Sequence, residues 1–450
     1  MRYKRLQKFR LSLKDCASRR QVRLRSWLRT SAWRLVPIGL LVLSLSEIGT
    51  ASDWTQFRGP GGSGISDETG LPLKWSSTEN VVWKTPLPGP GASCPITIRD
   101  RIYLTCYSGY GLEANQGQHK DLRRHVLCFE RHTGKVLWSK VFEPELPEHQ
   151  YGGEGSYHGY AASTPVTDGE RLYIFFGKSG VYCFDLDGKE QLWHVSVGDG
   201  INGWGSGSSP VLFDNYLIVN ASIESRSLVA LDKLSGAEKW RAGEINSAWN
   251  TPLVIAGKER TELVVSTDNR LRSFNPHDGK PLWDADGVHR YVCPSVVAHA
   301  DFVFAIGGGS TSLAVRMGGT GDVTASHGLW RQNKGSNVGS PIYLDGHLYW
   351  VAESGGGVCC QNATTGATVY EHRLDPEPGR VWSSPVLADG KLYIVSQNKG
   401  TFVIAAGPKF NLLAHNTFAD DESRTNASPA ISGGQIFMRT DQNLYCIGQK

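Results

Sequence analysis

The side chains best suited to chemistry concentrate in two long segments, Tyr107–Arg124 and Glu143–Tyr160. Three histidines and two of the acids in these segments are candidate ligands, namely His119, Asp121, His149, Glu154 and His158. Imidazole and carboxylate groups bind zinc-type ions, but the spacing of these residues matches no usual ligand pattern. Long segments of this kind in a compact domain are functional or solvent-exposed loops. We therefore expect loops here rather than a metal site, and we expect both to rise from one face.

Aromatic residues form a second candidate group. Trp249, Tyr291 and Trp382 each stand three positions before a recurring proline, and Trp204 lies nearby in sequence, before Pro210. The corresponding positions elsewhere carry other residues, namely Ala92, Ala162, Gly207, Val338 and Asn426. An arc of aromatic rings beside an open sector could stack on a sugar, a quinone or a peptide side chain. The alternative is that the rings only fill a central channel.

The candidate binding face combines both groups: Trp204, Trp249, Tyr291, Trp382, Asn426, His149, Glu154, Tyr157, His158 and Tyr160. We assign no catalytic residue, because no serine elbow and no zinc-type cluster of histidine and cysteine accompanies these side chains. The glycine-rich run Gly59–Gly64 follows no expected strand and opens no expected helix. A phosphate-binding loop is therefore not expected there.

The elements that must position these residues come from a repeat. Eight prolines recur, mostly as Ser-Pro-Val or a close variant: Pro95, Pro165, Pro210, Pro252, Pro294, Pro341, Pro385 and Pro429. Their spacings are 70, 45, 42, 42, 47, 44 and 44 residues, so only the first unit is enlarged. Repeat periods of about 40 to 50 residues are typical of propellers and solenoids.

Each unit divides into four short strands. In the seventh unit, Trp382–Leu387, Lys391–Ser396 and Thr401–Ile404 alternate apolar residues and are bounded by Asp, Gly or Asn. This pattern is typical of strands joined by tight turns.

Many units add a glycine turn followed by a tryptophan, as at Gly134 with Trp138 and, more loosely, at Gly321 with Trp330. Glycine allows the positive φ of the turn. The indole is a large apolar plate, which we expect to wedge between neighbouring sheets.

The last unit ends after three strands, near Ser428–Ile431, Gln435–Arg439 and Asn443–Gly448. Its missing outer strand is found at the other end of the chain, as Val81–Leu87, with Trp83 in the usual tryptophan position. Pairing the two ends would leave only short, protected sheet edges. The predicted fold is an all-β, eight-bladed propeller of four-stranded antiparallel sheets, with residues 52–80 leading into the closing strand.

The first 51 residues are typical of a secretory signal. Residues 1–34 carry twelve Lys or Arg, the apolar run Leu35–Leu45 follows, and Gly49-Thr50-Ala51 is a small-residue cleavage site. Eleven apolar residues are too few to span a bilayer comfortably, so a membrane link is expected only through an uncleaved leader. Removal of residues 1–51 leaves 35 bases and 41 acids, a net charge of −6. Nothing in this balance indicates nucleic-acid binding.

Eight cysteines remain after cleavage. Cys128, Cys183, Cys360 and Cys446 occupy matching third-strand positions, which indicates small buried fillers. Because exported proteins can form disulfides, Cys106 with Cys128 is a candidate pair on neighbouring strands.

The repeats resemble the PQQ-type repeat family, and so does the opening Asp53-Trp54-Thr55-Gln56-Phe57-Arg58-Gly59-Pro60. The resemblance covers residues 53–448 and is specific for fold. That family includes quinoprotein alcohol dehydrogenases and BamB-like scaffold lipoproteins of outer-membrane assembly. The opening is especially similar to exported propellers of planctomycete-type bacteria. A repeat motif that is structural does not establish cofactor binding.

The resemblance to dehydrogenases implies PQQ held between a tryptophan and a disulfide of adjacent cysteines, with Ca²⁺ on Glu and Asn and an Asp base. Cys359 and Cys360 are adjacent, but they lie in an expected third strand, where one cysteine faces each way. No Glu, Asn and Asp set maps to the calcium site. The scaffold lipoproteins carry a cysteine directly after the signal, whereas Ser52 follows Ala51 here.

We therefore predict a non-catalytic, monomeric propeller, exported to the periplasm or cell envelope, that binds a protein or glycan partner on its loop-rich face. No cofactor and no nucleic-acid partner is expected. The alternative is a PQQ-dependent alcohol or sugar dehydrogenase, which would need PQQ and Ca²⁺.

Overall fold

The structure, a computed structural model, describes residues 53–112, 117–151, 153–290, 292–308 and 310–449. The predicted signal peptide, residues 1–51, lies outside this part of the chain and stays a prediction. Within the described residues, no helix is both long enough and apolar enough to cross a membrane.

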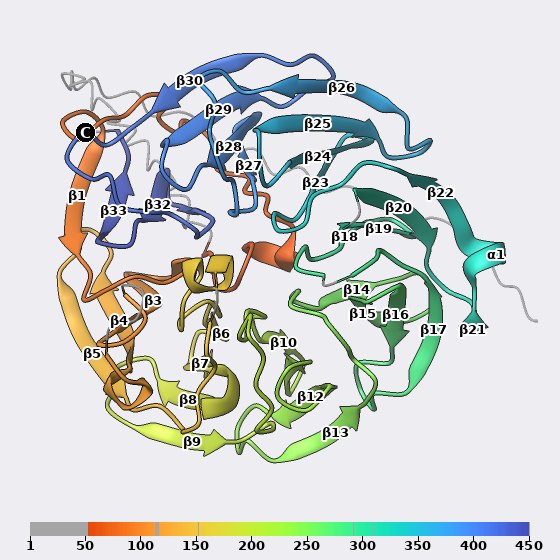
Figure 1. Cartoon of the computed structure of the whole chain (residues 1–450), viewed down its shortest axis with the longest axis horizontal. Coiled ribbons are helices and arrows are strands. Elements are labelled where there is room, and N and C mark those ends of the chain that lie inside the picture. Colours follow the sequence, from red (N-terminus) through yellow and green to blue (C-terminus); the bar gives the residue numbers. More distant parts are fainter. Residues whose placement is uncertain (1–52, 113–116, 152, 291, 309, 450) are drawn as a thin grey trace, which may run out of the picture. The chain divides into compact units, whose positions relative to one another are not determined.

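Eight antiparallel sheets follow one another around a ring, which confirms the predicted propeller (Figure 1). The strands of the first four blades are β2 (Ile96–Ile98), β3 (Arg101–Ser108), β4 (Arg123–Glu130), β5 (Val136–Phe142), β6 (Val166–Thr167), β7 (Arg171–Phe175), β8 (Val181–Asp185), β9 (Gln191–Val195), β10 (Val211–Phe213), β11 (Tyr216–Ala221), β12 (Ser227–Asp232), β13 (Glu238–Ala242), β14 (Leu253–Ala256), β15 (Thr261–Thr267), β16 (Arg270–Phe274) and β17 (Pro281–Asp286).

The strands of the last four blades continue the same order. They are β18 (Val297–His299), β19 (Phe302–Gly307), β20 (Thr311–Arg316), β22 (Gly328–Gln332), β23 (Ile342–Leu344), β24 (His347–Val351), β25 (Gly357–Asn362), β26 (Thr368–Arg373), β27 (Val386–Ala388), β28 (Lys391–Val395), β29 (Thr401–Ala405), β30 (Leu412–Asn416), β31 (Ala430–Ser432), β32 (Gln435–Arg439), β33 (Asn443–Ile447) and β1 (Val81–Pro86).

Short helical turns interrupt the connections between these strands. They are η1 (Pro60–Gly62), η2 (His119–Asp121), η3 (Gly153–Tyr157), η4 (Gly177–Ser179) and α1 (Thr324–His327). The predicted turn at Gly321 before Trp330 is wrong. Gly321 belongs to β21 (Gly321–Asp322), which pairs in parallel with β17 and adds a fifth strand to blade four.

The predicted tight turns are present between the first two strands of the blades. In blade seven, Ala388 pairs with Lys391, and the two residues between them, Asp389 and Gly390, have φ values of 50° and 66°. Two positive φ values in a two-residue hairpin loop match the twist of the flanking strands, which is why Asp-Gly is favoured there.

The outer tryptophans do wedge between blades. Trp83 lies on β1, and its indole N–H donates to the carbonyl of Arg131 in blade one at 2.8 Å. A Cβ added to Gly134 would clash with the Trp83 ring. The same arrangement joins Trp138 to Gly188 in the next pair of blades. The glycine turn of one blade therefore receives the tryptophan of the blade before it.

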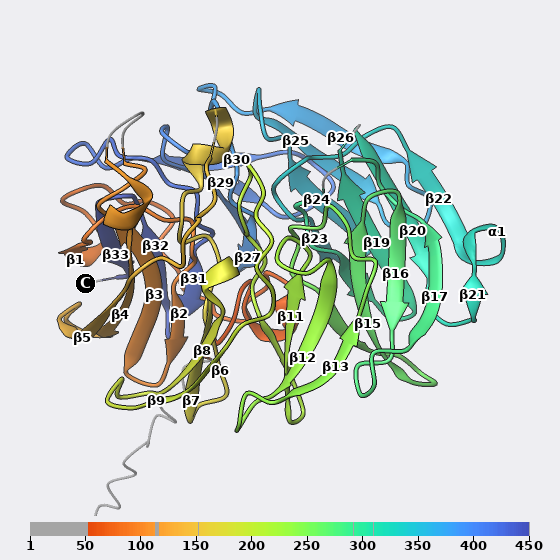
Figure 2. The same ribbon diagram turned by 60° about the horizontal axis from the view of Figure 1, so that its bottom comes forward.

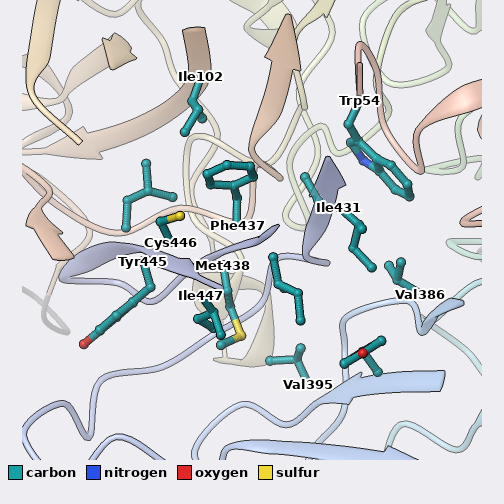
Figure 3. Close-up of a cluster of buried hydrophobic side chains, with 14 of the residues drawn as sticks. Trp54, Ile102, Val386, Val395, Ile431, Phe437, Met438, Tyr445, Cys446 and Ile447 are labelled. Carbon is teal, nitrogen blue, oxygen red and sulfur yellow. The ribbon is translucent and has the colours of Figure 1, made fainter. Parts of the chain in front are cut away.

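The two ends of the chain close the ring as predicted. β1 pairs antiparallel with β33, with Trp83 opposite Cys446. Figure 3 shows the apolar cluster at this closure, where Ile102 of blade one, Val386 of blade seven and Phe437 of blade eight gather with Trp54. Burial of these side chains supplies the hydrophobic free energy that holds the ends together.

One repeat assignment is wrong. In blade five, Val297 pairs with Phe304, just as Val386 pairs with Tyr393 in blade seven. The equivalent of the recurring proline is therefore Val296, because it precedes Val297 as Pro385 precedes Val386. Pro294 lies two positions earlier and only imitates the pattern.

The four third-strand cysteines are buried fillers, as predicted. Cys128, Cys183 and Cys360 lie opposite Tyr103, Tyr173 and Tyr349 on the second strand of their blades. The candidate disulfide between Cys106 and Cys128 is wrong. Cys106 pairs with His125, three residues along the ladder from Cys128, and the two thiols pack into different apolar clusters.

Candidate functional site

The two insertions of blade one pack together on one face, as the order of the strands predicts. The ring centroids of Tyr107 and Tyr160 are 5.5 Å apart, and those of Tyr110 and Tyr160 are 5.8 Å apart. The predicted limits of the first loop are wrong, because Tyr107 pairs with Arg124 in the β3–β4 ladder. β3 ends at Ser108, and β4 begins at Arg123.

We call residues 143–160 the cap. It connects blade one to blade two, yet its tip reaches blades seven and eight across the ring. Glu154 forms an ion pair with Arg380. The carbonyl of Tyr157 accepts a hydrogen bond from Nδ2 of Asn426 at 2.5 Å, and its ring lies 5.8 Å from that of Trp382. The cap therefore bridges the first two blades and the last two on this face.

The base of the cap is fixed by a buried ion pair. The Arg124 guanidinium donates to the Glu148 carboxylate at 2.6 Å, and the two side chains are 3% and 0% exposed. Arg124 also donates to the carbonyl of Tyr160 at 2.9 Å. Removal of one partner of such a pair would leave an uncompensated buried charge, so the cap is attached to β4 at this point.

The cap is also tied to the connection between blades two and three. Nδ1 of His149 accepts the backbone N–H of Asn202 at 3.0 Å. In the same connection, the carbonyl of Gly205 accepts the indole N–H of Trp249 at 2.8 Å. Trp204, between these two points, is 43% exposed. Two predicted aromatic residues and the cap thus form one connected structure.

The opposite end of the channel is filled by the lead-in, residues 54–66. Its backbone pairs with Thr97 and Thr167 in blades one and two and with Leu387 in blade seven. The buried guanidinium of Arg58 donates to the carbonyls of Gly62, Ser63 and Pro341. Figure 2 shows the orange lead-in and the gold cap at opposite ends of the ring. The lead-in was predicted only as a connection to β1.

Between cap and lead-in lies a cavity of about 440 Å³. Its lining includes the residues three positions before the recurring proline, residues of the cap and of the connections around it, and Phe57 of the lead-in. The lining residues are Phe57, Ala92, Cys94, Glu154, His158, Ala162, Trp204, Gly207, Trp249, Cys293, Asn337, Val338, Ser340, Glu353, Ser354, Arg380, Trp382, Ser384, Asn426 and Ser428. This volume lies within the range of about 300 to 1,000 Å³ that is typical of small-molecule sites.

Six of the ten predicted face residues line this cavity: Trp204, Trp249, Trp382, Asn426, Glu154 and His158. Tyr157 packs against Trp382, whereas His149 and Tyr160 are buried in the base of the cap. Tyr291 lies outside the described residues. The corrected repeat of blade five places Cys293 three positions before Val296, and Cys293 does line the cavity.

A closed ring of hydrogen bonds between neighbouring blades surrounds the cavity. Each blade donates one backbone N–H to a hydroxyl or thiol of the next blade. The members of the ring are, in order, Cys94, Thr164, Ser209, Thr251, Ser295, Ser340, Ser384 and Ser428, which returns to Cys94. The distances range from 2.9 to 3.2 Å. This ring explains why Ser or Thr recurs in the repeat.

The two carboxylates at the cavity already have protein partners. Glu353 accepts hydrogen bonds from Nδ2 and the backbone N–H of Asn337, at 2.9 and 3.2 Å. His158 is partly buried, and burial lowers the pKa of its imidazole to about 4, so it is neutral near pH 7. No described pair at the cavity is placed as a nucleophile with its base. The arrangement is suited to binding.

The sequence did not identify Asn337, Glu353, Arg380 or Phe57. Glu353 lies between β24 and β25, the same kind of connection that was singled out in blade one. The loop between the second and third strands of a blade lies on the cap face, so the same reasoning applied to the short loop of blade six could have identified Glu353. Phe57 could not be found in this way, because its position depends on the long-range path of the lead-in.

The histidines and acids of the two insertions do not gather. His119 packs against Tyr110, with ring centroids 4.6 Å apart, while Asp121 accepts the backbone N–H of Gln118. Across the described ranges, no group of three or more His, Cys, Asp or Glu side chains is placed to hold a metal ion.

The family model of the outer membrane protein assembly factor BamB matches residues 122–245, 177–406 and 319–448, more than half of the chain. Among curated proteins none matches. BamB from Moraxella catarrhalis is a similar solved structure, with 13% identity and a TM-score of 0.57 over 82% of this chain and 97% of that one.

Two enzymes share the fold. A europium-containing methanol dehydrogenase has 10% identity and a TM-score of 0.63 over 87% of this chain and 90% of its own. A quinohemoprotein alcohol dehydrogenase from Pseudomonas putida HK5 has 8% identity and a TM-score of 0.62 over 89% and 81%. Identities this low establish the fold and not the activity. By its sequence match, the chain belongs to the family of the outer membrane protein assembly factor BamB.

Proposed function

We propose that this protein is an exported, non-catalytic propeller that binds a protein or glycan partner on the face that carries the cap. The observation behind this proposal is the cavity beneath the cap, which has three tryptophans in its lining. Aromatic rings with a few fixed polar groups are typical of binding sites.

The rigidity of the face supports a binding role. The cap is fixed at its base by the Arg124–Glu148 pair and at its tip by the Glu154–Arg380 pair. Trp249 is tied to the neighbouring connection through Gly205. A surface that is ordered before binding avoids the entropic cost of ordering loops when the partner arrives.

The residues at the cavity do not fit the quinone cofactor of the dehydrogenases. Cys359 and Cys360 pack into different apolar clusters on the two sides of β25, and neither lines the cavity. The two carboxylates in the lining, Glu154 and Glu353, are already engaged by Arg380 and Asn337. These contacts favour the non-catalytic proposal over a calcium-bound quinone.

Export is part of the proposal and depends on the predicted signal, residues 1–51. The family name, which refers to outer-membrane assembly, is consistent with it. Western blots of periplasmic, membrane and cytoplasmic fractions of a Gram-negative host would test it. Recovery of the full-length chain in the cytoplasm, with no shortened form elsewhere, would contradict export.

The binding role can be tested by capture of material from solubilised envelopes on the immobilised chain 52–450. A face variant would carry Ile201→Asp and Trp204→Asp, at side chains that are 50% and 43% exposed. A matched control would carry Leu137→Asp and Val141→Asp on the outer strand β5, at positions that are 44% and 56% exposed. We expect a specific component to bind the wild type and the control but not the face variant.

Equal capture by all three proteins would contradict a partner site on the cap face.

A separate measurement addresses the enzymatic alternative. The purified chain would be incubated with PQQ and Ca²⁺ and assayed for dye-linked oxidation of alcohols and sugars. Turnover in that assay would overturn the non-catalytic proposal.

A further inference from the structure

We propose that the cavity beneath the cap binds the pyranose ring of a neutral sugar, as the end of a glycan or as a free saccharide. This inference rests on the proposed binding function and deepens it, because it names the chemical group that enters the site. Three features of the cavity carry it, namely its aromatic residues, its planar polar groups and its balance of charge.

The aromatic residues come from three separate parts of the ring. Trp204 precedes blade three, Trp249 precedes blade four and Trp382 precedes blade seven. Each is only partly buried, so each keeps indole surface that a ligand can cover. The C–H groups on one face of a pyranose are apolar and slightly positive, and they complement the negative face of an indole ring.

The polar groups are planar and held in fixed orientations. The Glu353 carboxylate is oriented by Asn337, and the Asn426 amide is held between Tyr157 and Gln397, whose Nε2 donates to its Oδ1 at 2.6 Å. Carboxylate, amide and guanidinium groups each present two hydrogen-bonding atoms side by side. Neighbouring hydroxyls on a sugar ring present two matching groups at a similar separation.

The charges of the lining argue against an anionic ligand. Two carboxylates and one guanidinium line the cavity, so a multiply charged anion would meet a net negative surface. The Glu154 carboxylate neutralises Arg380. Glu353 is held by the neutral partners Ser336 and Asn337, so a cationic group is the competing ligand that the test must separate from a neutral sugar. Arg58, the buried cation of the lead-in, is held by three carbonyls and does not belong to the lining.

A wholly apolar ligand is disfavoured as well. The Glu353 carboxylate and the Arg380 guanidinium can make more hydrogen bonds than their protein partners use, so an apolar ligand would displace water from them without replacing it, which costs free energy. A neutral molecule with one apolar face and many hydroxyls satisfies both halves of the lining. A pyranose has this character.

The test uses chain 52–450 and measures the change in tryptophan fluorescence, checked by calorimetry, on titration with a panel of neutral methyl pyranosides. Tetramethylammonium and citrate serve as the cationic and anionic probes. We expect saturable binding of at least one pyranoside and of neither ion. Trp204→Ala should weaken that binding about tenfold, the loss expected when one aromatic contact is removed.

Leu137→Ala is the matched control, because Leu137 is exposed on the outer strand β5 and does not line the cavity. It should bind the pyranoside as the wild type does. Glu353→Gln keeps the shape of the side chain and removes its charge, and it should weaken binding of the pyranoside.

Saturable binding of citrate or tetramethylammonium, but of no pyranoside, would overturn the sugar assignment. The same panel, added as competitors in the envelope capture assay, separates this inference from the proposed function. Capture that persists at saturating concentrations of every pyranoside would refute the sugar inference and leave the partner site standing. Failure of capture in the wild type would count against the partner site itself.

Discussion

The backbone N–H of Ser428 donates to the Sγ of Cys94 at 3.2 Å, and this contact joins the last blade to the first. Every other junction in the same ring uses a hydroxyl oxygen as acceptor. Cys94 also lines the cavity. The contact therefore links the closure of the propeller to the structure of the candidate site.

Cys94→Ala should destabilise the fold more than Cys94→Ser. Alanine removes the acceptor and leaves the buried N–H of Ser428 without a partner, which costs about 1 to 3 kcal/mol. Serine restores an acceptor of the kind found in the other blades. Urea unfolding of the two variants measures the difference in free energy of unfolding. Equal stabilities would mean that the contact between Cys94 and Ser428 contributes nothing.

Gly134→Ala tests the wedge between the closing strand and blade one. Gly134 has φ of +71°, and an added Cβ would clash with the Trp83 ring. The variant should therefore combine backbone strain with overpacking, each of which costs about 1 to 3 kcal/mol. Guanidinium unfolding would give the total loss of stability.

Gly390→Ala is the control for backbone strain alone. Gly390 has a similar φ of +66°, but its added Cβ would meet no atom within 4 Å. We expect it to lose clearly less stability than Gly134→Ala. If the two variants lose the same amount, the Trp83 contact is not tight.

The repeat made the fold predictable because each blade buries the same residue types at the same places. Ser384, Pro385 and Val386 mark a strand entry that seven other blades repeat in some form. Blade five misled the assignment because Pro294 supplies the expected residue two positions too early. Only the pairing of Val297 with Phe304 reveals the shift, and pairing depends on the neighbouring strand.

The site was less predictable because it is assembled from contacts distant in sequence. Trp249 and Trp382 were found, since they keep a fixed offset from the recurring proline. The contacts of Glu154 with Arg380 and of Tyr157 with Asn426 join residues more than 200 positions apart. No local pattern specifies where the tip of an insertion lies, so the contacts of the cap with Arg380 and Asn426 could not be derived.

Glu224 should make the protein less stable as the pH rises from about 4.5 to 7. This side chain is 3% exposed in the β11–β12 turn, and burial raises the pKa of its carboxyl to about 7. The folded state binds the proton more tightly than the unfolded state, so the stabilisation is complete below the unfolded pKa and is lost above the folded one. The loss is about 3 kcal/mol.

Glu224→Gln stays neutral and removes this dependence. We expect the variant to exceed the wild type in free energy of unfolding near pH 8 and to differ little from it near pH 4.5. Urea unfolding at both pH values gives the comparison. A constant difference between the two proteins would show that Glu224 does not titrate as its burial requires.

His158 should act in the opposite direction, because burial lowers its pKa to about 4. The folded state binds this proton more weakly than the unfolded state, so the stabilisation is present above about pH 6.5 and is lost as the pH falls towards 4. His158 lies in the cap, and the loss should appear first as weaker protection of residues 143–160 from hydrogen exchange.

His158→Gln should reduce the change in protection between these pH values. A smaller slope should remain, because burial also lowers the pKa of His149 at the base of the cap. If the protection of the cap in the wild type does not change with pH once intrinsic exchange rates are corrected, His158 is not buried against the cavity in solution.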